Sequence, residues 1–564
     1  TINATAPWLL ALYVALAEEQ ELRVEALQGT VQNDIIKEYL SRGTYIFPPE
    51  DSLNLIADVT EYCYKNIPKW NPINICSYHL QEAGATIEEE VAFAISTATA
   101  VLDKIRLRVS AEEFPFVVGR VSFFVNAGIK FISEICKMRA FVELWNEICL
   151  TKYGVKEEKF RRFRYGVQVN SLGLTEQQPE NNVYRILIQM LPVVIAKNSR
   201  ARAVQLPAWN EALGLPRPWD QQWSLRLQQI MAYETDLLEF GDIFKGSSEI
   251  KKKVNELKKQ AKHELNEIDK LGGLISAIET GYMKKKLVHS QTIRQKNIES
   301  GEQIVVGVNC FTEGAKSPLM DSDDGGFMKV DQTAEKNQII NVVEWKKKRN
   351  QKKIQSLLKE LSNTAKDGEN IMEISIECAH AGVTTGEWGN VMREVFGEYR
   401  APTGIASSYM QQNKRAEQKV LEIRKRVDII SKNVKKRPKM LVGKPGLDGH
   451  SNGAEQIAVR AKDVGFEVVY DGIRSTPEQL VNTCIEESID IIGLSILSGS
   501  HIYLVKEIRM LLKKIGLDRL PIVVGGIIPP KDENKLLKIG VKAVFTPKNF
   551  QIEDIMSRIV DILE

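Results

Sequence analysis

The chain is 564 residues long, 43% apolar and 26% charged, and its 76 basic and 73 acidic side chains leave a net charge of +3. This length exceeds what one hydrophobic core usually serves, so a prior of roughly 150 residues per domain predicts about three or four structural units. The composition excludes extensive disorder, and the small net charge gives no field that would favour nucleic acid or a membrane surface as a partner.

The cysteines and the apolar segments bear on the compartment. Seven cysteines are scattered along the chain without a C-x-x-C pair, which is typical of a reducing compartment, so we expect a cytoplasmic protein. The longest apolar stretches, such as Leu9 to Ala17, are too short to span a bilayer and lack a cleavable signal pattern. The chain begins with Thr1 inside an element already under way, and we expect a fragment of a longer protein.

Residues 1–320 are predicted to form an α/β domain of the barrel type. From Thr1 to about Asn309, short β-like runs alternate with longer helical segments, the order of βα units around a parallel sheet. The candidate strands are Arg23 to Leu27, Asn74 to Ser77, Val121 to Phe124, Gly166 to Asn170, Val204 to Ala208 and Ile304 to Val308.

Polar side chains lie in or just after these predicted strands. A barrel core is usually filled by branched apolar side chains, so this pattern indicates a lumen or mouth that holds a ligand. For any single residue, an ordinary polar position in a βα loop is the alternative. The residues are Thr30, Gln32, Asn71, Asn74, Ser77, His79, Ser122, Gln168 and Asn170.

Residues 321–438 are predicted to be a linker region with a helical unit inside it. The composition is polar and rich in Gly and Asp from Asp321 to Asn350, and rich in Lys, Arg, Glu and Gln from Gln411 to Lys439. Between them, Glu344 to Arg400 is predicted to be helical. The stretch from Thr384 to Trp388 has a threonine followed three residues later by a glutamate, the pattern of a capping box at a helix start.

Residues 439–564 are predicted to form a doubly wound, flavodoxin- or Rossmann-like domain, in which five apolar strands alternate with amphipathic helices. Ligands of such folds bind beyond the carboxyl ends of the strands. The predicted strands are Met440 to Val442, Glu467 to Tyr470, Asp490 to Leu494, Ile522 to Val524 and Ala543 to Phe545. The first helix is predicted to face the sheet with Ala454, Ile457, Ala458, Ala461 and Val464.

A glycine-rich loop follows the first of these strands. Its notable residues are Lys444, Gly446, Asp448, Gly449, His450 and Gly453. A metal-bound imidazole usually has its other nitrogen held by a carboxylate, so Asp448 can hold His450 while Lys444 orients Asp448. The glycines let a bulky ring approach the backbone. On physical grounds alone, phosphate-binding and receiver-like domains share a strand with a Gly-rich turn, and a loop histidine can be structural.

The C-terminal motifs resemble the cobalamin-binding domain shared by the coenzyme-B12 mutases and methionine synthase. The pattern is Asp448-x-His450-x-x-Gly453, Ser495-x-Leu497 and Gly525-Gly526. The resemblance implies that His450 replaces the cofactor's own lower base on cobalt. It also implies that the nucleotide tail of the cofactor runs toward Ser495, and that Gly525 and Gly526 make room for it. We assign Lys444 and Gly449 to the cofactor with the same loop.

The N-terminal region resembles the barrel of acyl-CoA mutases such as methylmalonyl-CoA mutase, and the likeness covers nearly the whole chain. It rests on Gly29 to Asp34, Asn74 to Gly84, Arg120 to Phe124 and Asn210 to Pro216. The runs Gln205 to Glu211 and Pro216 to Gln222 are more similar to ethylmalonyl-CoA mutases. The resemblance implies the rearrangement of ethylmalonyl-CoA to methylsuccinyl-CoA, with methylmalonyl-CoA and succinyl-CoA, or a non-catalytic cobalamin-binding protein, as alternatives.

The resemblance also implies adenosylcobalamin as the cofactor: its 5′-deoxyadenosyl radical takes a hydrogen from the substrate, and the thioester group then migrates. His79 matches the histidine that hydrogen-bonds the thioester carbonyl, and Arg42 matches the arginine that pairs with the free carboxylate. A structural loop histidine and a plain surface arginine are the alternatives. The other matches are Thr30, Gln32, Asn71 and Gln168 on the substrate, Arg120 and Ser122 on the CoA arm, and Glu211 on the adenosyl ribose.

The sequence departs from the family at two places. The family barrel opens with βα units that carry a tyrosine over the reacting carbons, and nothing before Thr1 supplies them, so we expect a chain truncated there to lack mutase activity. The family's Gly-Pro-Gly-Thr-like turn is Thr546-Pro547-Lys548-Asn549 here, which puts the contacts of that loop to the corrin in doubt. We expect a homodimer and a cofactor-loading GTPase chaperone, although neither can be read from the residues.

Overall fold

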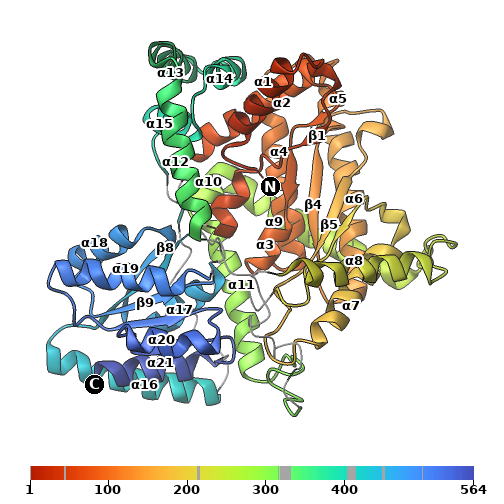
Figure 1. Ribbon diagram of the computed structural model, residues 1–564. Helices are drawn as coiled ribbons and strands as arrows, with labels where there is room; N and C mark the ends of the chain where they lie inside the picture. The colour runs from red at the N-terminus through yellow and green to blue at the C-terminus, as the bar shows by residue number, and fades with distance from the viewer. Residues whose placement is uncertain are drawn as a thin grey trace.

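Figure 1 shows two α/β bodies with α11 (Tyr282–Glu299) between them, the N-terminal one in red to yellow and the C-terminal one in blue. The computed structural model describes residues 2–42, 46–211, 216–314, 317, 332–399, 401–402, 414–446, 451–497, 499–549 and 551–564. No helix within these ranges is long and apolar enough to cross a membrane.

The N-terminal body combines short parallel strands with surrounding helices. Its strands are β1 (Gly29–Thr30), β2 (Trp70–Asn71), β3 (Asn74–Cys76), β4 (Ser122–Ala127), β5 (Arg164–Val169) and β6 (Val204–Gln205). Its helices up to α11 are α1 (Ala6–Glu19), α2 (Pro49–Asn66), α3 (Tyr78–Glu82), α4 (Ile87–Arg106), α5 (Phe114–Val118), α6 (Phe131–Thr151), α7 (Asn181–Ile195), α8 (Pro218–Tyr233), α9 (Ser248–Lys270) and α10 (Leu274–Glu279). Single helical turns are found at Val24–Ala26, Glu38–Arg42, Glu158–Phe160 and Lys197–Ser199.

The strands β3, β4, β5 and β6 form one parallel sheet in chain order, and β1 pairs in parallel with β2. Side chains alternate between the two faces of β4. Phe123 packs outward on Trp145 of α6, with ring centroids 5.0 Å apart. Ser122 and Asn126 lie on the opposite, inner face, where Gln168 of β5 is the register partner of Asn126. The inner face therefore carries polar side chains, as predicted for a lumen that holds a ligand.

Four further helices follow, of which the last three share its hydrophobic cluster: α12 (Gln332–Lys348), α13 (Gln351–Lys366), α14 (Met372–His380) and α15 (Thr385–Phe396). Trp388 of α15 stacks on Trp8 of α1 with ring centroids 6.0 Å apart, and Trp8 Nε1 donates to Thr385 Oγ1 at 3.0 Å. The predicted capping box is confirmed, because Thr384 N donates to Glu387 Oε2 at 2.9 Å and Glu387 N donates to Thr384 Oγ1 at 3.4 Å. Buried residues of α13 to α15 share the hydrophobic cluster of the barrel strands.

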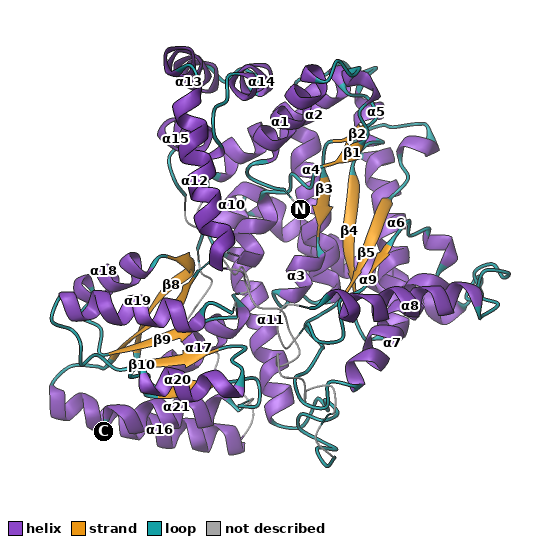
Figure 2. Ribbon diagram, in the orientation of Figure 1, coloured by secondary structure: helices purple, strands orange, loops and turns teal. Residues whose placement is uncertain are grey.

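The C-terminal body is a parallel sheet with helices on both faces (Figure 2). Its elements are α16 (Lys414–Val434), β7 (Lys439–Pro445), α17 (Asn452–Asp463), β8 (Glu467–Ser475), α18 (Pro477–Glu486), β9 (Ile491–Ser495), α19 (His501–Lys514), β10 (Ile522–Gly525), α20 (Pro530–Lys538), β11 (Ala543–Phe545) and α21 (Ile552–Leu563). The strand order is β11-β10-β9-β7-β8, the flavodoxin-like order. Met440 and Val442 face α16, α17 and α21, whereas Leu441 faces α18 to α20.

All five strands predicted in the C-terminal domain are confirmed. Two predicted strands of the N-terminal region are wrong. Arg23 to Leu27 contains the 3₁₀ turn Val24–Ala26, and Ile304 to Val308 makes a single bridge, from Val306 to Cys310. Asn309 closes the second segment into a loop, since its Nδ2 donates to Ile298 O at 2.7 Å and to Gln303 O at 2.8 Å. Neither segment pairs with a strand in the described part of the chain.

Candidate active site

Arg42 and His79 come from two turns that follow neighbouring strand segments. The π-helical turn Glu38–Arg42 follows β1, and α3, with His79 at its second position, follows β3. The segments are adjacent because Asn74 N donates to Gln32 O at 2.8 Å. Both turns therefore lie at the carboxyl edge of the barrel strands, where ligands of parallel α/β folds bind. Turns of π type are rare and are frequent at functional sites.

The structure brings Arg42 and His79 into direct contact. Arg42 Nη2 lies 2.8 Å from His79 Nε2. The buried Lys37 places Nζ 3.3 Å from Nδ1 and 3.4 Å from Nε2 of the same ring. His79 is 5% exposed, and its ring lies on that of Tyr78 with centroids 3.8 Å apart. Two cationic groups and one aromatic ring therefore hold the imidazole in place.

Glu38 balances these cations. Its Oε1 lies 3.1 Å from Lys37 Nζ and 3.7 Å from Arg42 Nη1, and it accepts a hydrogen bond from Asn3 Nδ2 at 2.7 Å. Burial alone would raise the pKa of Glu38, but Lys37 and Arg42 outweigh burial and hold the pKa below its usual value. Glu38 is therefore anionic at neutral pH and fixes the guanidinium one helical turn away.

Asp34 links the two turns through hydrogen bonds to the backbone just before each turn. Its Oδ2 accepts from Cys76 N at 2.7 Å, and its Oδ1 accepts from Lys37 N at 3.3 Å. Burial raises the pKa of Asp34 to about 6, although Lys37 opposes the rise. Sequence reasoning missed Asp34, Lys37 and Glu38. The i,i+4 spacing of Glu38 and Arg42 was a signal that could have predicted the ion pair between them.

Thr30, Asn71 and Ser122 form a hydrogen-bonded group at the amino end of the inner face. Asn71 Nδ2 donates to Thr30 Oγ1 at 3.2 Å and to Ser122 Oγ at 2.5 Å. Arg120 Nη1 donates to Trp70 O at 3.3 Å next to this group. These four predicted substrate residues lie together, at the opposite end of the strands from His79.

Polar atoms without partners mark the lumen between these two ends. Gln32 Oε1 and both polar atoms of Asn126 are buried and have no hydrogen-bond partner among the described residues. Gln168 Nε2 donates to Val169 O at 3.1 Å. Buried polar groups normally have partners, so such atoms indicate where a bound molecule would complete the hydrogen bonding. Asn126 was not predicted, although its alternation with Ser122 along β4 was a signal that could have found it.

Glu211, the predicted contact to the adenosyl ribose, is exposed in a turn. The turn follows Trp209 and Asn210, whose Nε1 and Nδ2 donate to the buried Asp220 at 3.0 and 2.9 Å. Residues 212–215 lie outside the described part of the chain.

The predicted cofactor residues that are described lie at the carboxyl edge of the C-terminal sheet. Lys444 is near the end of β7, while Ser495 and Gly525 end β9 and β10 as register partners and Leu497 follows β9. Gly526 has φ of 146°, and a Cβ there would lie 1.9 Å from Ile496 O, so only glycine fits. Asp448, Gly449 and His450, the predicted cobalt ligand, lie outside the described residues.

This edge fits a bulky ring with a tail. Gly453 and Gly499 face open space, and nothing lies closer than 3.9 Å to the position of a Cβ on Gly525. The edge also meets the barrel, since Ser451 Oγ donates to Ser41 O at 3.2 Å beside Arg42. A ligand on the C-terminal sheet would thus lie between that sheet and the turns that carry Arg42 and His79.

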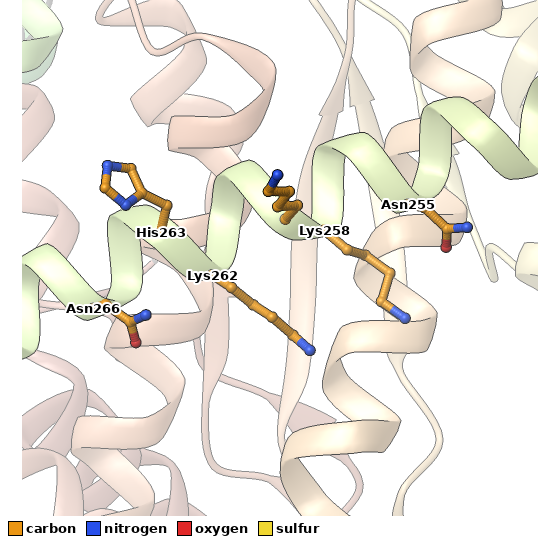
Figure 3. Close-up of a pocket in the computed structure, with 6 residues that line it drawn as sticks. Asn255, Lys258, Lys262, His263 and Asn266 are labelled. Atoms are coloured by element: carbon orange, nitrogen blue, oxygen red, sulfur yellow. The ribbon is translucent and has the colours of Figure 1, made fainter.

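A surface groove of about 560 Å³ lies elsewhere, along α9 (Figure 3). The labelled side chains all come from this one helix. Lys258 pairs with Glu143 of α6 at 3.1 Å, and Lys262 pairs with Glu147. These ion pairs explain the lysines as a solvated helix face, and we assign the groove no role.

Comparison with known proteins connects this geometry to a family. Residues 1–398 match the family described as methylmalonyl-CoA mutase, and residues 438–550 match the B12 binding domain. The chain belongs to the methylmalonyl-CoA mutase family. The prediction of an acyl-CoA mutase with a TIM-type barrel and a cobalamin domain is thereby confirmed.

Three relatives in the family show the range of similarity. The ethylmalonyl-CoA mutase of Cereibacter sphaeroides is 57% identical over 564 residues, which cover 100% of this chain and 85% of that protein. The ethylmalonyl-CoA mutase of Methylorubrum extorquens is 56% identical over 566 residues, covering 100% and 81%. The human mitochondrial methylmalonyl-CoA mutase is 33% identical over 553 residues, covering 97% and 72%.

Proposed function

We propose that this mutase interconverts ethylmalonyl-CoA and methylsuccinyl-CoA. The observation that carries the proposal is the 2.8 Å contact between Arg42 and His79 at the barrel edge that faces the cobalamin domain. A guanidinium fork suits a carboxylate, and an imidazole suits a thioester carbonyl; the proposed substrate carries both groups. The 57% identity to an ethylmalonyl-CoA mutase, against 33% to a methylmalonyl-CoA mutase, supports the choice of substrate.

In this proposal the barrel residues bind and orient the substrate. Arg42, held by Glu38, binds the free carboxylate, and His79 donates to the thioester carbonyl. Gln32 and Gln168 line the lumen along the acyl group and the pantetheine arm. Thr30, Asn71, Arg120 and Ser122 contact the CoA arm at the far end. The lumen therefore orders the substrate along its length, which lowers the entropic cost of reaching the reactive geometry.

The C-terminal sheet holds the cofactor in the same proposal. His450 would hold the cobalt with the support of Lys444 and Asp448, Glu211 would contact the adenosyl ribose, and the tail of the cofactor would lie along Gly449, Gly453, Ser495, Leu497, Gly525 and Gly526. When bound, adenosylcobalamin supplies the radical that abstracts hydrogen from the substrate. Lys37 and His79 are buried, which would exclude water from a substrate bound beside them.

The competing substrate is methylmalonyl-CoA, which lacks one methylene. We expect kcat/KM for ethylmalonyl-CoA to exceed that for methylmalonyl-CoA by about 10- to 100-fold, because one methylene in a pocket is worth about 1–3 kcal/mol. The measurement is the two kcat/KM values with adenosylcobalamin on the complete protein. A higher value for methylmalonyl-CoA would show the substrate proposal to be wrong.

In the same assay, His450→Ala tests the cobalt ligand, and unchanged turnover would contradict that role.

We also propose a cytoplasmic location, because all seven cysteines are described and each is a free thiol, as expected in a reducing compartment. The homodimer and the cofactor-loading GTPase chaperone stay predictions. Gel filtration with light scattering tests the first, and cofactor loading with and without a nucleotide-hydrolysing partner tests the second.

A further inference from the structure

Two adjacent residues of the cobalamin domain reach the turns that carry Arg42 and His79. Ser451 Oγ donates to Ser41 O at 3.2 Å, and Ser41 directly precedes Arg42. Asn452 Nδ2 donates to Glu82 O, and Glu82 ends the short helix α3 that carries His79. Ser451 and Ser41 are both buried. The first two described residues after His450 are thus hydrogen-bonded to the two turns that carry Arg42 and His79.

The side chain of Ser451 makes this contact instead of a local one. Ser451 is the N-cap of α17, a position where a serine usually accepts a hydrogen bond from the first turn of its own helix. Its side chain makes no such cap here. Losing an N-cap costs about 1 kcal/mol, so the contact with the barrel replaces a local stabilisation.

A hydrogen bond within each receiving turn ties its two ends together. Ser41 Oγ donates to Lys37 O at 2.7 Å inside the π-helical turn. In α3, Ala83 N donates to His79 O at 2.9 Å. Arg42 and His79 touch each other, so the two turns and the start of α17 form a closed ring of contacts. A displacement of α17 that keeps both hydrogen bonds would therefore move the turns that carry Arg42 and His79.

Other contacts join the two bodies without touching this ring. Lys284 of α11 pairs with Glu455 of α17 at 2.6 Å, and both side chains are buried. Gln177 Nε2 donates to Pro547 O at 2.9 Å in an exposed contact. These contacts hold the domains together, whereas those of Ser451 and Asn452 reach the substrate-binding turns.

We propose that Ser451 and Asn452 are positioning residues that couple cobalamin binding to acyl-CoA binding through the backbone at Ser41 and Glu82. The inference rests on the proposed function. Ser451 and Asn452 directly follow His450 in the sequence, so the two hydrogen bonds tie the residues next to the predicted cobalt ligand to the turns that hold Arg42 and His79. By thermodynamic reciprocity, acyl-CoA binding at these turns strengthens cofactor binding by the same factor.

The test is the coupling between two ligands. The dissociation constant of adenosylcobalamin is measured on the full chain by calorimetry, with and without saturating butyryl-CoA and ethylmalonyl-CoA in separate series, using single-injection analysis on ice to limit turnover. We expect ethylmalonyl-CoA to tighten cofactor binding in the wild type by about 5- to 100-fold, the usual range of allosteric coupling. In the double variant Ser451→Ala with Asn452→Ala, this factor should fall toward one. A purely structural loss would weaken binding without changing the factor.

Matched variants sharpen the result. Gln177→Ala removes an interdomain hydrogen bond outside the ring and should keep the wild-type coupling factor. Ser451→Thr retains a hydroxyl and should keep most of the wild-type coupling factor. The near-isosteric Asn452→Asp loses the donor and should not keep it. These single variants also serve if the double variant fails to fold.

The outcomes separate the two proposals. Wild-type coupling that persists in the double variant and in Asn452→Asp would overturn the role of Ser451 and Asn452, as would two ligands that bind the wild type independently. A wild type that binds neither ligand overturns the proposed function, and the inference with it.

Discussion

At the scale of single residues, the contact between Arg42 and His79 sets the orientation of the guanidinium group. Glu38, which accepts a hydrogen bond from Asn3, holds Arg42 from one side, and Arg42 Nη2 lies 2.8 Å from His79 Nε2. A carboxylate that approaches therefore finds an oriented guanidinium instead of a free side chain, so less rotamer entropy remains to be lost on binding.

Replacing Arg42 by Lys tests this orientation. Lysine keeps the charge but loses the planar fork, so we expect Arg42→Lys to weaken ethylmalonyl-CoA binding by about 10- to 100-fold, since hydrogen bonds to charged groups are worth about 1.5–3 kcal/mol. Butyryl-CoA lacks the free carboxylate and should bind both proteins alike. Calorimetric dissociation constants for the two thioesters provide the measurement. Equal weakening of binding for both thioesters would show that Arg42 does not recognise the carboxylate.

Arg42 and His79 could be predicted from the sequence, but the residues that hold them could not. Their chemistry is local and visible in a motif, whereas the contact with Lys37 depends on a π-helical turn, which has no residue signature. Gln32, Thr30, Asn71 and Ser122 were found by their polarity in strands. Asp34, buried beneath the two turns, could not be recognised as part of the site, because its burial comes from contacts distant in sequence.

At the scale of elements, a buried ion triad locks α4 to α6 behind the site. Lys137 Nζ lies 2.7 Å from Glu90 Oε2 and 2.7 Å from Glu134 Oε2. Glu90 Oε1 accepts from Ser77 Oγ and from Asn126 N, both at 2.9 Å. Ser77 is the N-cap residue of α3, so the triad also supports the helix that carries His79. Burial raises the pKa of Glu90, although Lys137 opposes the rise.

Replacing Lys137 by Met leaves two buried carboxylates without their cation. We expect Lys137→Met to reduce the free energy of unfolding by about 3–5 kcal/mol, the usual cost of breaking a buried ion pair. Urea unfolding followed by circular dichroism measures the loss. Lys152→Met is the matched control: its pair with Asp103 has the same 2.7 Å separation but is about half exposed, so its loss should be below about 1 kcal/mol. Similar losses in the two variants would contradict the buried triad.

The elements themselves were predicted unevenly. The central C-terminal strands β7, β9 and β10 are largely apolar runs that are mostly buried, a pattern that specifies a parallel strand strongly. Arg23 to Leu27 and Ile304 to Val308 had strand-like residues but no neighbouring strand to pair with, so pairing overrode local preference. The domain limits at residues 320 and 438 stay predictions. The first limit separates α13 to α15 from the barrel, although both contribute to one hydrophobic cluster.

At the scale of the whole molecule, an acidic cluster lies where the barrel meets the cobalamin domain. Arg460 of α17 lies 3.3 Å from Glu299 of α11, 3.1 Å from Glu553 of α21 and 3.6 Å from Asp463. Three buried carboxylates thus face one guanidinium. Burial and the neighbouring Glu553 raise the pKa of Glu299 to about 7, while Gln295, Arg460 and Ile552 N oppose the rise.

This cluster makes stability depend on pH near neutrality. Between pH 4.5 and about 7, the folded protein keeps a proton on Glu299 that the unfolded chain has released. The stabilisation is therefore complete below pH 4.5 and is lost as the pH rises through about 7. We expect the melting temperature of Glu299→Gln to fall less than that of the wild type between pH 6 and pH 8.

Scanning calorimetry over this range measures the difference. The exposed Glu302→Gln, three residues further along, is the control and should follow the wild type. Parallel pH profiles for the wild type and Glu299→Gln would contradict the role of Glu299.

The separate hydrophobic cores have a consequence for how the cofactor enters. None of the buried apolar clusters of the described chain mixes residues up to Ala401 with residues from Val420 onward. The described contacts between the halves include hydrogen bonds and ion pairs, such as those from Ser451 to Ser41 and from Lys284 to Glu455. Separating the halves would therefore expose polar groups that water can bind but no shared hydrophobic core. The cost of moving one folded half relative to the other to admit a large cofactor would then be set by these polar contacts and not by the unfolding of a core.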